Sequence, residues 1–149
     1  MNRKSFIKDC ASACLQGLVI SGMLQGCSGS KILTGKIGGD DLLVAVKDFE
    51  VKNGNNVYYR KYVIVQNELL RYPICVYRFN DHDYSALWMQ CTHQGTELQV
   101  FGDKLQCPAH GSEFDSQGGI RNGPAESKLR TFPVTVANDL LKISLKAVS

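Results

Sequence analysis

The chain has 149 residues, of which 44% are hydrophobic and 21% are charged, and its formal net charge is +3. These values describe one ordinary globular domain with enough apolar side chains for its own core, and they exclude disordered and fibrous proteins. Because no run of Lys or Arg and no basic patch interleaved with aromatic residues occurs, we expect no nucleic-acid partner.

An export signal is predicted over residues 1–26. Three basic residues among the first eight precede a weakly apolar stretch from Ala11 to Leu24, which is the layout of a secretory signal. This stretch is too short and too polar to span a hydrocarbon core of about 30 Å, so we expect no membrane-spanning helix there. The following Leu24-Gln25-Gly26-Cys27 resembles the lipobox of bacterial lipoproteins, which implies cleavage before Cys27 and lipidation of its thiol.

The first residues also bear on the export route. Arg3-Lys4 and the residues up to Lys8 resemble the twin-arginine motif, with lysine in place of the second arginine. That route carries folded cargo. An ordinary secretory signal is the alternative. Both predict an exported protein that faces the periplasm or the cell exterior and is held at a membrane by its lipid anchor.

Cysteine usage indicates metal binding. Removing the signal takes two of the six cysteines away, lipidation uses Cys27, and Cys75, Cys91 and Cys107 remain. An odd number of cysteines does not make a disulfide framework, although disulfides are their usual use in exported proteins. Cys75 lies in a strand-like apolar run and is predicted to be a buried free thiol. The other two are candidate metal ligands.

Residues 27–39 are predicted to be a lipidated flexible tether. They contain four glycines and little periodicity, and a tether of this length has a root-mean-square reach of roughly 20 Å. The alternative is a first strand through Ile32 to Ile37.

Residues 40–149 are predicted to form one all-β domain. Leu42, Val44 and Val46 follow a period of two, and a turn at 53–56 leads into a second strand-like run at 58–65. No helical pattern of ten or more residues follows the signal, and many short strands without βα alternation indicate small antiparallel sheets. Further strands are predicted at 74–79, 84–90, 97–101, 104–107, 129–136 and 140–145.

Two loops concentrate the candidate metal ligands. Residues 91–96 read Cys-Thr-His-Gln-Gly-Thr, and residues 107–112 read Cys-Pro-Ala-His-Gly-Ser. Two such loops at the tips of adjacent hairpins can close a four-ligand site from Cys91, His93, Cys107 and His110. Gly95 and Gly111 would let the backbone turn sharply and approach a ligand closely.

This pattern resembles the Rieske family, in which Cys-x-His is followed by a spacer and Cys-x-x-His. The likeness extends to Gly111, to Ser112 and to the Gly123-Pro124-Ala125 stretch, which resembles the proline loop that covers the cluster in cytochrome bc-type subunits. It implies one [2Fe-2S] cluster with the two cysteines on one iron and the two histidines on the other. Neutral imidazoles lower the negative charge of the cluster and so raise its reduction potential.

The resemblance also implies a fold and a way of docking. It predicts three small antiparallel sheets with the cluster loops at one tip, and outward histidine N–H groups that dock a redox partner. Gly95, Gly111, Ser112 and Pro124 would surround the ligands, and the Ser112 hydroxyl would hydrogen-bond a cluster sulfide.

The sequence departs from the bc-type pattern at three positions. Thr96 and Ala109 stand where those proteins carry a disulfide, and Phe114 replaces a tyrosine that donates to a ligand cysteine. Because hydrogen bonds around a metal tune its potential, we expect a value within the Rieske range of about −150 to +300 mV but below the members that have these features.

The function expected is one-electron transfer, as a subunit or carrier in a membrane-associated or periplasmic oxidoreductase system. Expected partners are a cytochrome or an oxidoreductase subunit, and a quinol is a second candidate. We expect no catalytic residues and no mononuclear-iron domain of the kind that follows the Rieske domain in oxygenases. The alternative is a structural or binding lipoprotein whose Cys2His2 site holds zinc or has lost its metal. His82, in a polar turn, is predicted to be solvated, as are the carboxylates at 81, 83, 113 and 115.

Overall fold

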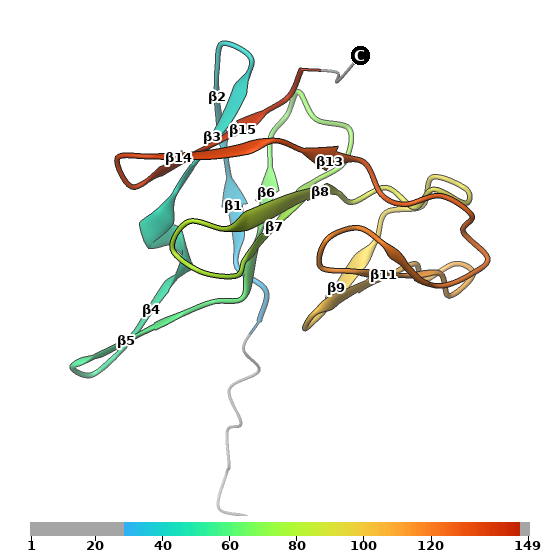
Figure 1. The fold of residues 1–149 in the computed structure, drawn as a ribbon, viewed down its shortest axis with the longest axis horizontal. Coiled ribbons are helices and arrows are strands. Elements are labelled where there is room, and N and C mark those ends of the chain that lie inside the picture. The colour runs from blue at the N-terminus through green and yellow to red at the C-terminus, as the bar shows by residue number, and fades with distance from the viewer. Residues whose placement is uncertain (1–28, 147–149) are drawn as a thin grey trace, which may run out of the picture.

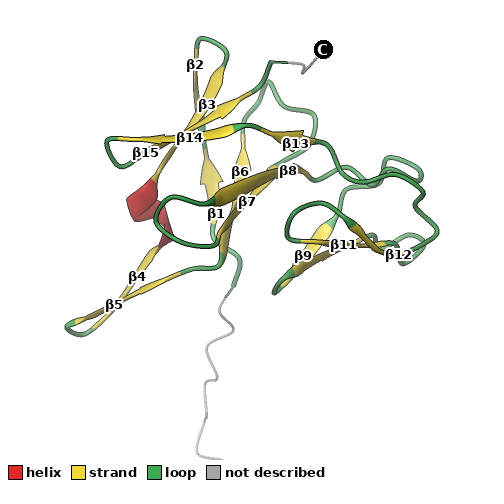
Figure 2. Cartoon of the chain, viewed as in Figure 1, coloured by secondary structure: helices red, strands yellow, loops and turns green. Residues whose placement is uncertain are grey.

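The computed structural model describes residues 29–146 and shows an all-β protein with a single 3-10 turn, η1 (Val46–Phe49) (Figure 2). The predicted fold class is therefore confirmed. The predicted signal peptide and the predicted lipidation residue Cys27 lie outside the described residues. Within residues 29–146, no helix is long and apolar enough to cross a membrane.

The strands form three main sheets and one two-stranded ribbon (Figure 1). The central sheet has the order β1 (Ile32–Thr34), β6 (Tyr62–Gln66), β7 (Ile74–Arg78), β8 (Tyr84–Trp88) and β13 (Thr131–Phe132). The second sheet has the order β14 (Val134–Ala137), β15 (Leu140–Ser144), β3 (Asp41–Ala45) and β2 (Lys36–Gly38). The third has the order β12 (Ile120–Asn122), β11 (Glu113–Asp115), β10 (Lys104–Gln106) and β9 (Gln99–Phe101), and the ribbon pairs β4 (Glu50–Asn53) with β5 (Asn56–Tyr59).

The prediction of a flexible tether is wrong for residues 32–38. β1 pairs in parallel with β6, and β2 pairs antiparallel with β3. Gly35, between them, packs so closely that an added Cβ would lie 2.6 Å from side-chain atoms of both Leu42 and Val65. The alternative of a first strand through Ile32 to Ile37 is the one the structure supports, with a break at Gly35. The tether was the first interpretation because this stretch is rich in glycine, and strands of only three residues leave little apolar pattern in the sequence.

Burial on both faces of the central sheet explains its continuous apolar runs. Ile74, Val76 and Ala86 face the second sheet, together with Leu42 and Ile143. The alternate residues Cys75, Tyr77 and Leu87 face the third sheet, where Leu105 and Phe114 lie. Strands covered on both sides read as unbroken hydrophobic sequence rather than as alternation. The molecule is therefore layered, and Cys75 is a fully buried free thiol, as predicted.

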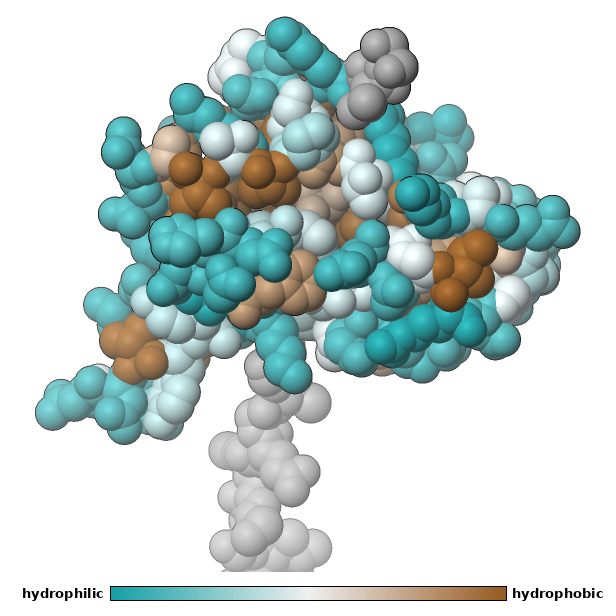
Figure 3. Space-filling view, in the orientation of Figure 1, coloured by the Kyte–Doolittle hydropathy of each residue, from teal (hydrophilic) through white to brown (hydrophobic). Residues whose placement is uncertain are grey.

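The third sheet carries the candidate ligands and stands apart at one end of the molecule (Figure 1). The loops before β9 and between β10 and β11 lie at its outer edge. At the other end, the β4–β5 ribbon projects from the body, and Figure 3 shows a hydrophobic group on it. Its exposed apolar side chains include Val57 and Tyr58, which are 49% and 55% exposed. β4, β11 and β12 were not predicted, because each is very short and polar.

Candidate metal centre

Both candidate loops are built on the same hydrogen-bond frame. The N–H of Cys91 donates to the carbonyl of Thr96 at 2.8 Å, and the N–H of Gly95 donates back to the carbonyl of Cys91 at 2.8 Å. In the second loop, the same pair of bonds joins Cys107 to Ser112 at 2.8 Å and Gly111 to Cys107 at 3.0 Å. The loops therefore match position by position, although the histidine follows the cysteine by two residues in one and by three in the other.

The turning glycines of these frames adopt a left-handed conformation, as predicted. Gly95 has φ of 75° and Gly111 has φ of 78°, which other residues adopt at a cost. Gly95 also lies in a crowded place, since an added Cβ would come within 3.3 Å of the Gln90 side chain. Both glycines thus serve the shape of the loops.

The structure brings the predicted ligand residues together as two pairs, the cysteines in one and the histidines in the other. Cys91 and Cys107 are each 2% exposed and belong to the core between the central and third sheets. His93 and His110 are exposed, and their ring centroids lie 5.0 Å apart with the planes at 88°. The two cysteines are thus buried, and the two imidazoles lie at the surface.

The local environment favours the thiolate form of Cys107. Burial acts to raise the pKa of this thiol. Hydrogen bonds from the backbone N–H groups of His110 and Ala109 lower the pKa, and the side chains of Cys91 and Thr96 lower it further. The net result is a pKa below the ordinary value. A thiolate is the form that binds metal. Because its side chain interacts with Cys107, Thr96 lies beside the second loop. Thr96 occupies one of the two positions where bc-type proteins carry the disulfide.

Three hydrogen bonds hold the loops to their surroundings. The hydroxyl of Tyr72 donates to the carbonyl of Gly95 at 2.6 Å, and the hydroxyl of Thr92 donates to the carbonyl of Ser127 at 2.6 Å. The fully buried Ser112 hydroxyl accepts from the N–H of Ala125 at 3.0 Å. The segment after the cis Gly123–Pro124 bond thus contacts both loops. Tyr72, Thr92 and Ser127 were not predicted, since their partners lie 23 or 35 residues away in sequence.

Of the four carboxylates predicted to be solvated, Asp81 and Asp83 are exposed, as expected, while Glu113 and Asp115 are only partly exposed. Three of the four have structural partners. Glu113 pairs with Lys104 at 2.5 Å, and Asp81 pairs with Arg78. Asp115 accepts the N–H groups of Gln117 and Gly119 at 2.8 Å each, which closes the turn before β12.

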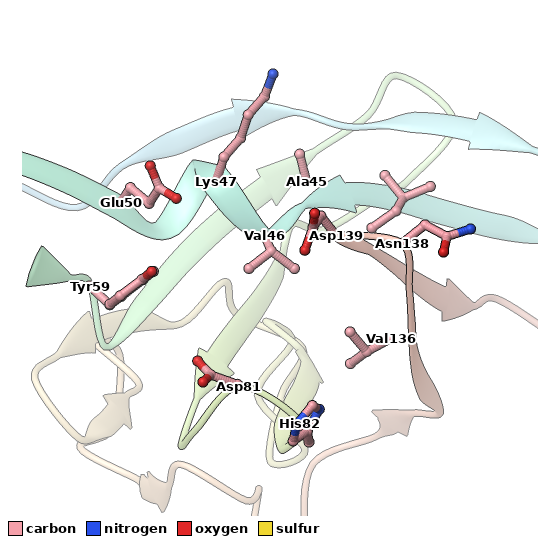
Figure 4. A pocket seen from close by; sticks show the side chains of 11 residues that line it. Ala45, Val46, Lys47, Glu50, Tyr59, Asp81, His82, Val136, Asn138 and Asp139 are labelled. Atoms are coloured by element: carbon pink, nitrogen blue, oxygen red, sulfur yellow. The ribbon is translucent and has the colours of Figure 1, made fainter. Parts of the chain in front are cut away.

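His82 is exposed in the β7–β8 turn, as predicted, and it lines a groove far from the candidate loops. Glu50, Asp81 and Asp139 reach this groove from three different segments, and Figure 4 shows them around Val46. None of the four candidate ligands lines it.

The donor set fits a two-iron cluster. Within residues 29–146, no three His, Cys, Asp or Glu side chains gather as ligands of a single ion. A Rieske cluster requires only two protein ligands at each iron, two cysteines at one and two histidines at the other. The pair of buried sulfurs and the pair of outer imidazoles match this requirement.

Comparison with known proteins agrees with this geometry. A family model described as the Rieske [2Fe-2S] domain matches residues 42–133. The chain belongs to this family. Membership implies that the protein carries one [2Fe-2S] cluster and transfers electrons through it.

Two relatives by sequence are subunits of the same kind of complex. The chain is 39% identical over 56 residues to the cytochrome b6-f complex iron-sulfur subunit 2 of a Nostoc species, covering 36% of this chain and 32% of that protein. It is 41% identical over 71 residues to the corresponding subunit of Synechococcus elongatus, covering 45% and 39%. The aligned part thus spans about a third of these relatives.

Among solved structures, the chain is similar to the cyanobacterial plasma membrane Rieske protein PetC3 from Synechocystis. The two share 28% sequence identity with a TM-score of 0.50, over 56% of this chain and 86% of that one. The shared part supports the fold and the family.

Proposed function

We propose that this protein is a one-electron carrier in which Cys91 and Cys107 ligate one iron and His93 and His110 ligate the other. The observation that carries this assignment is the matched pair of loop frames, which set two sulfurs inside and two imidazoles outside. When bound, the cluster supplies a single electron-accepting centre whose potential its ligands and hydrogen bonds set.

The surrounding residues shield the cluster, present it to a partner and tune its potential. The core around the two cysteines excludes water from the sulfur side, while the exposed rings of His93 and His110 offer N–H groups to a redox partner. The Ser112 hydroxyl accepts from Ala125, which leaves its own proton free to donate to a sulfide. Because Phe114 has no hydroxyl and no disulfide joins the loops, we propose a potential within the Rieske range but below that of the members with a tyrosine and a disulfide at these positions.

We further propose that the carrier works on the outer side of a bacterial membrane, held by a lipid on Cys27. The lipobox-like stretch before that residue supports this location, and the subunit names of the relatives support membrane association. Its partner would be a cytochrome or an oxidoreductase subunit, with a quinol as a second candidate donor.

Electron paramagnetic resonance of the reduced protein tests the ligand assignment. The wild-type protein and the His82→Ala control should give the signal of a Cys/His-ligated two-iron cluster, while Cys91→Ser and His110→Ala should lose it. A colourless wild-type protein with stoichiometric zinc would overturn the proposal in favour of the zinc site. A redox titration of the same signal measures the potential.

The anchor needs a separate test. In cells, Cys27→Ser should abolish labelling by a fatty-acid analogue and release the domain from the membrane fraction. Unchanged labelling would contradict lipidation of Cys27, and it would leave the ligand assignment untouched.

A further inference from the structure

A pocket of about 470 Å³ lies where the third sheet meets the central sheet. Residues 59–61, which lead from the end of β5 to β6, and residues 77–79 at the end of β7 form one wall. Asp103, in the β9–β10 turn, and Ser116, after β11, form the other. None of the residues of the two candidate loops lines this pocket, and nothing in the electron-transfer proposal uses it.

The pocket gathers unsatisfied hydrogen-bond donors. Within residues 29–146, four buried side-chain polar atoms lack a hydrogen-bond partner, and three of them belong to residues that line this pocket: Arg60 Nε, Tyr77 Oη and Arg78 Nε. Buried polar groups are nearly always paired, so three orphans in one place call for an explanation. Tyr77 is 2% exposed, and its hydroxyl lies near the Cys75 thiol, whose sulfur is a weak acceptor, and within the influence of Tyr62 and Asp103.

The pocket is also positively charged. Arg60 and Lys61 make no ion pair within the described part of the chain, while Arg78 uses its terminal nitrogen on Asp81 and keeps Nε free. The carboxylate in the lining, Asp103, is held by Arg121 at 2.9 Å. Arg121, which lies outside the lining, thus balances most of the Asp103 charge, and Lys61 within the lining adds to its effect.

The orientation of one of the guanidinium groups is fixed before any ligand arrives. Arg78 lies over the ring of Tyr59 at 4.1 Å from the centroid, which sets the plane of its guanidinium group. The backbone N–H of Arg60 donates to the carbonyl of Phe49 at 2.7 Å, and that of Arg78 donates to Lys61 at 2.8 Å. Backbone hydrogen bonds thus fix the positions from which these side chains extend.

We propose that this pocket, which we call the junction pocket, binds a phosphate-class oxyanion. The pocket offers the hydrogen-bond donors of two guanidinium groups, an ammonium group and a phenol. A planar carboxylate has too few acceptor oxygens for all of them, whereas a tetrahedral oxyanion has enough. A bound phosphate would bridge the central sheet and the third sheet.

Two sources supply this chemistry, free phosphate and the headgroup of an anionic lipid. A second groove shares Tyr59, Arg60 and Lys61 with the junction pocket and continues along Gly29 to Lys31, where the described chain begins. The pocket therefore lies beside the end of the domain that leads toward Cys27, which gives a membrane headgroup access to it.

Calorimetric titration of the cluster-loaded full chain with inorganic phosphate tests the proposal, with chloride at equal ionic strength as the salt control. Phosphate should bind the wild-type protein, and Arg60→Gln and Lys61→Gln should each weaken that binding at least fivefold. Lys36→Gln, which removes the same charge from an exposed residue of β2, should leave it unchanged. Tyr77→Phe, which keeps every charge, should also weaken binding.

Vesicle flotation of the Cys27→Ser chain distinguishes the two sources. Retention on phosphatidylglycerol vesicles but not on phosphatidylcholine, lost in Arg60→Gln and competed by phosphate, would assign the pocket to a lipid headgroup. Phosphate binding without retention would assign it to the free ion. Equal behaviour of Arg60→Gln and Lys36→Gln in both experiments would overturn the proposal. All variants should keep the cluster signal, so failure here is separable from failure of the electron-transfer assignment.

Discussion

The hydroxyl of Tyr72 donates to the carbonyl of Gly95 at 2.6 Å, and this bond ties the first candidate loop to the segment that leads into β7. No disulfide joins the two loops, so contacts of this kind hold them in place. Tyr72 is half-buried against Trp88, with ring centroids 5.7 Å apart, which fixes the position of its hydroxyl.

We therefore expect Tyr72→Phe to loosen the first loop. The substitution removes one hydrogen bond and keeps the ring packing, so unfolding should become easier by about 1 kcal/mol. The cluster should also be lost faster to an iron chelator, followed by its visible absorption. Tyr58→Phe, at a 55% exposed tyrosine of the ribbon, is the matched control. Equal rates of loss in both variants would contradict a role for the Tyr72 bond.

Phe114→Tyr should raise the reduction potential. Phe114 is fully buried in the same core as Cys107, and a hydroxyl there would donate to the cluster environment. A bond that favours the reduced state by about 1 kcal/mol corresponds to roughly 40 mV for one electron. Redox titration measures the shift, and Phe101→Tyr, at a 51% exposed residue, should give none. An unchanged or lower potential in Phe114→Tyr would refute the expectation.

Cys75 should be chemically silent in the folded protein. Burial raises the pKa of its thiol far above the ordinary value, outweighing the effect of Tyr77. Because the raised pKa disfavours the thiolate, alkylation by iodoacetamide at pH 8.5 should spare Cys75 in the folded, cluster-loaded protein and modify it after denaturation, as peptide mass spectrometry would show. Modification of the folded protein would mean that the core opens.

Cys75→Ser should separate structural cysteine from ligand cysteine. A hydroxyl in this apolar position should lower the free energy of unfolding by about 1–3 kcal/mol without removing the cluster signal. Loss of the signal in a folded Cys75→Ser protein would show that the ligand set is wrong.

Gly35→Ala should destabilise the domain by about 1–3 kcal/mol through overpacking, because its Cβ would meet Leu42 and Val65 at 2.6 Å. Urea unfolding measures this cost. Gly38→Ala, whose nearest contact is 3.3 Å from Leu43, should cost less. Equal costs would indicate that β1 and β2 do not pack as described.

The sequence predicted best where one local pattern decides the structure. The ligand loops are read from four chemically unusual residues at short spacing, and the glycines after them predict the turns. The buried role of Cys75 followed from an unbroken apolar run. These features need no knowledge of distant partners, because each is set within a few residues.

What the sequence could not predict depends on pairing across long separations. β1 is only three residues long, and it forms a strand because it pairs with β6. The partner of Ile32 is Ile64, which is 32 residues away in sequence. The bond from Thr92 to Ser127 and the unsatisfied donors of the junction pocket arise in the same way, from segments that meet only in the fold. Short polar strands such as β12 carry too little periodicity to be read alone.

The position of β1 also limits how far the domain can lie from a lipid on Cys27. If Cys27 carries the lipid, only four residues separate it from Ile32, where the parallel ladder with β6 begins. Fully extended, that connection spans at most about 18 Å. The distance of the domain from the bilayer is then limited by this short connection, and His93 and His110 can meet only partners whose own cofactor lies within that limited reach of the membrane.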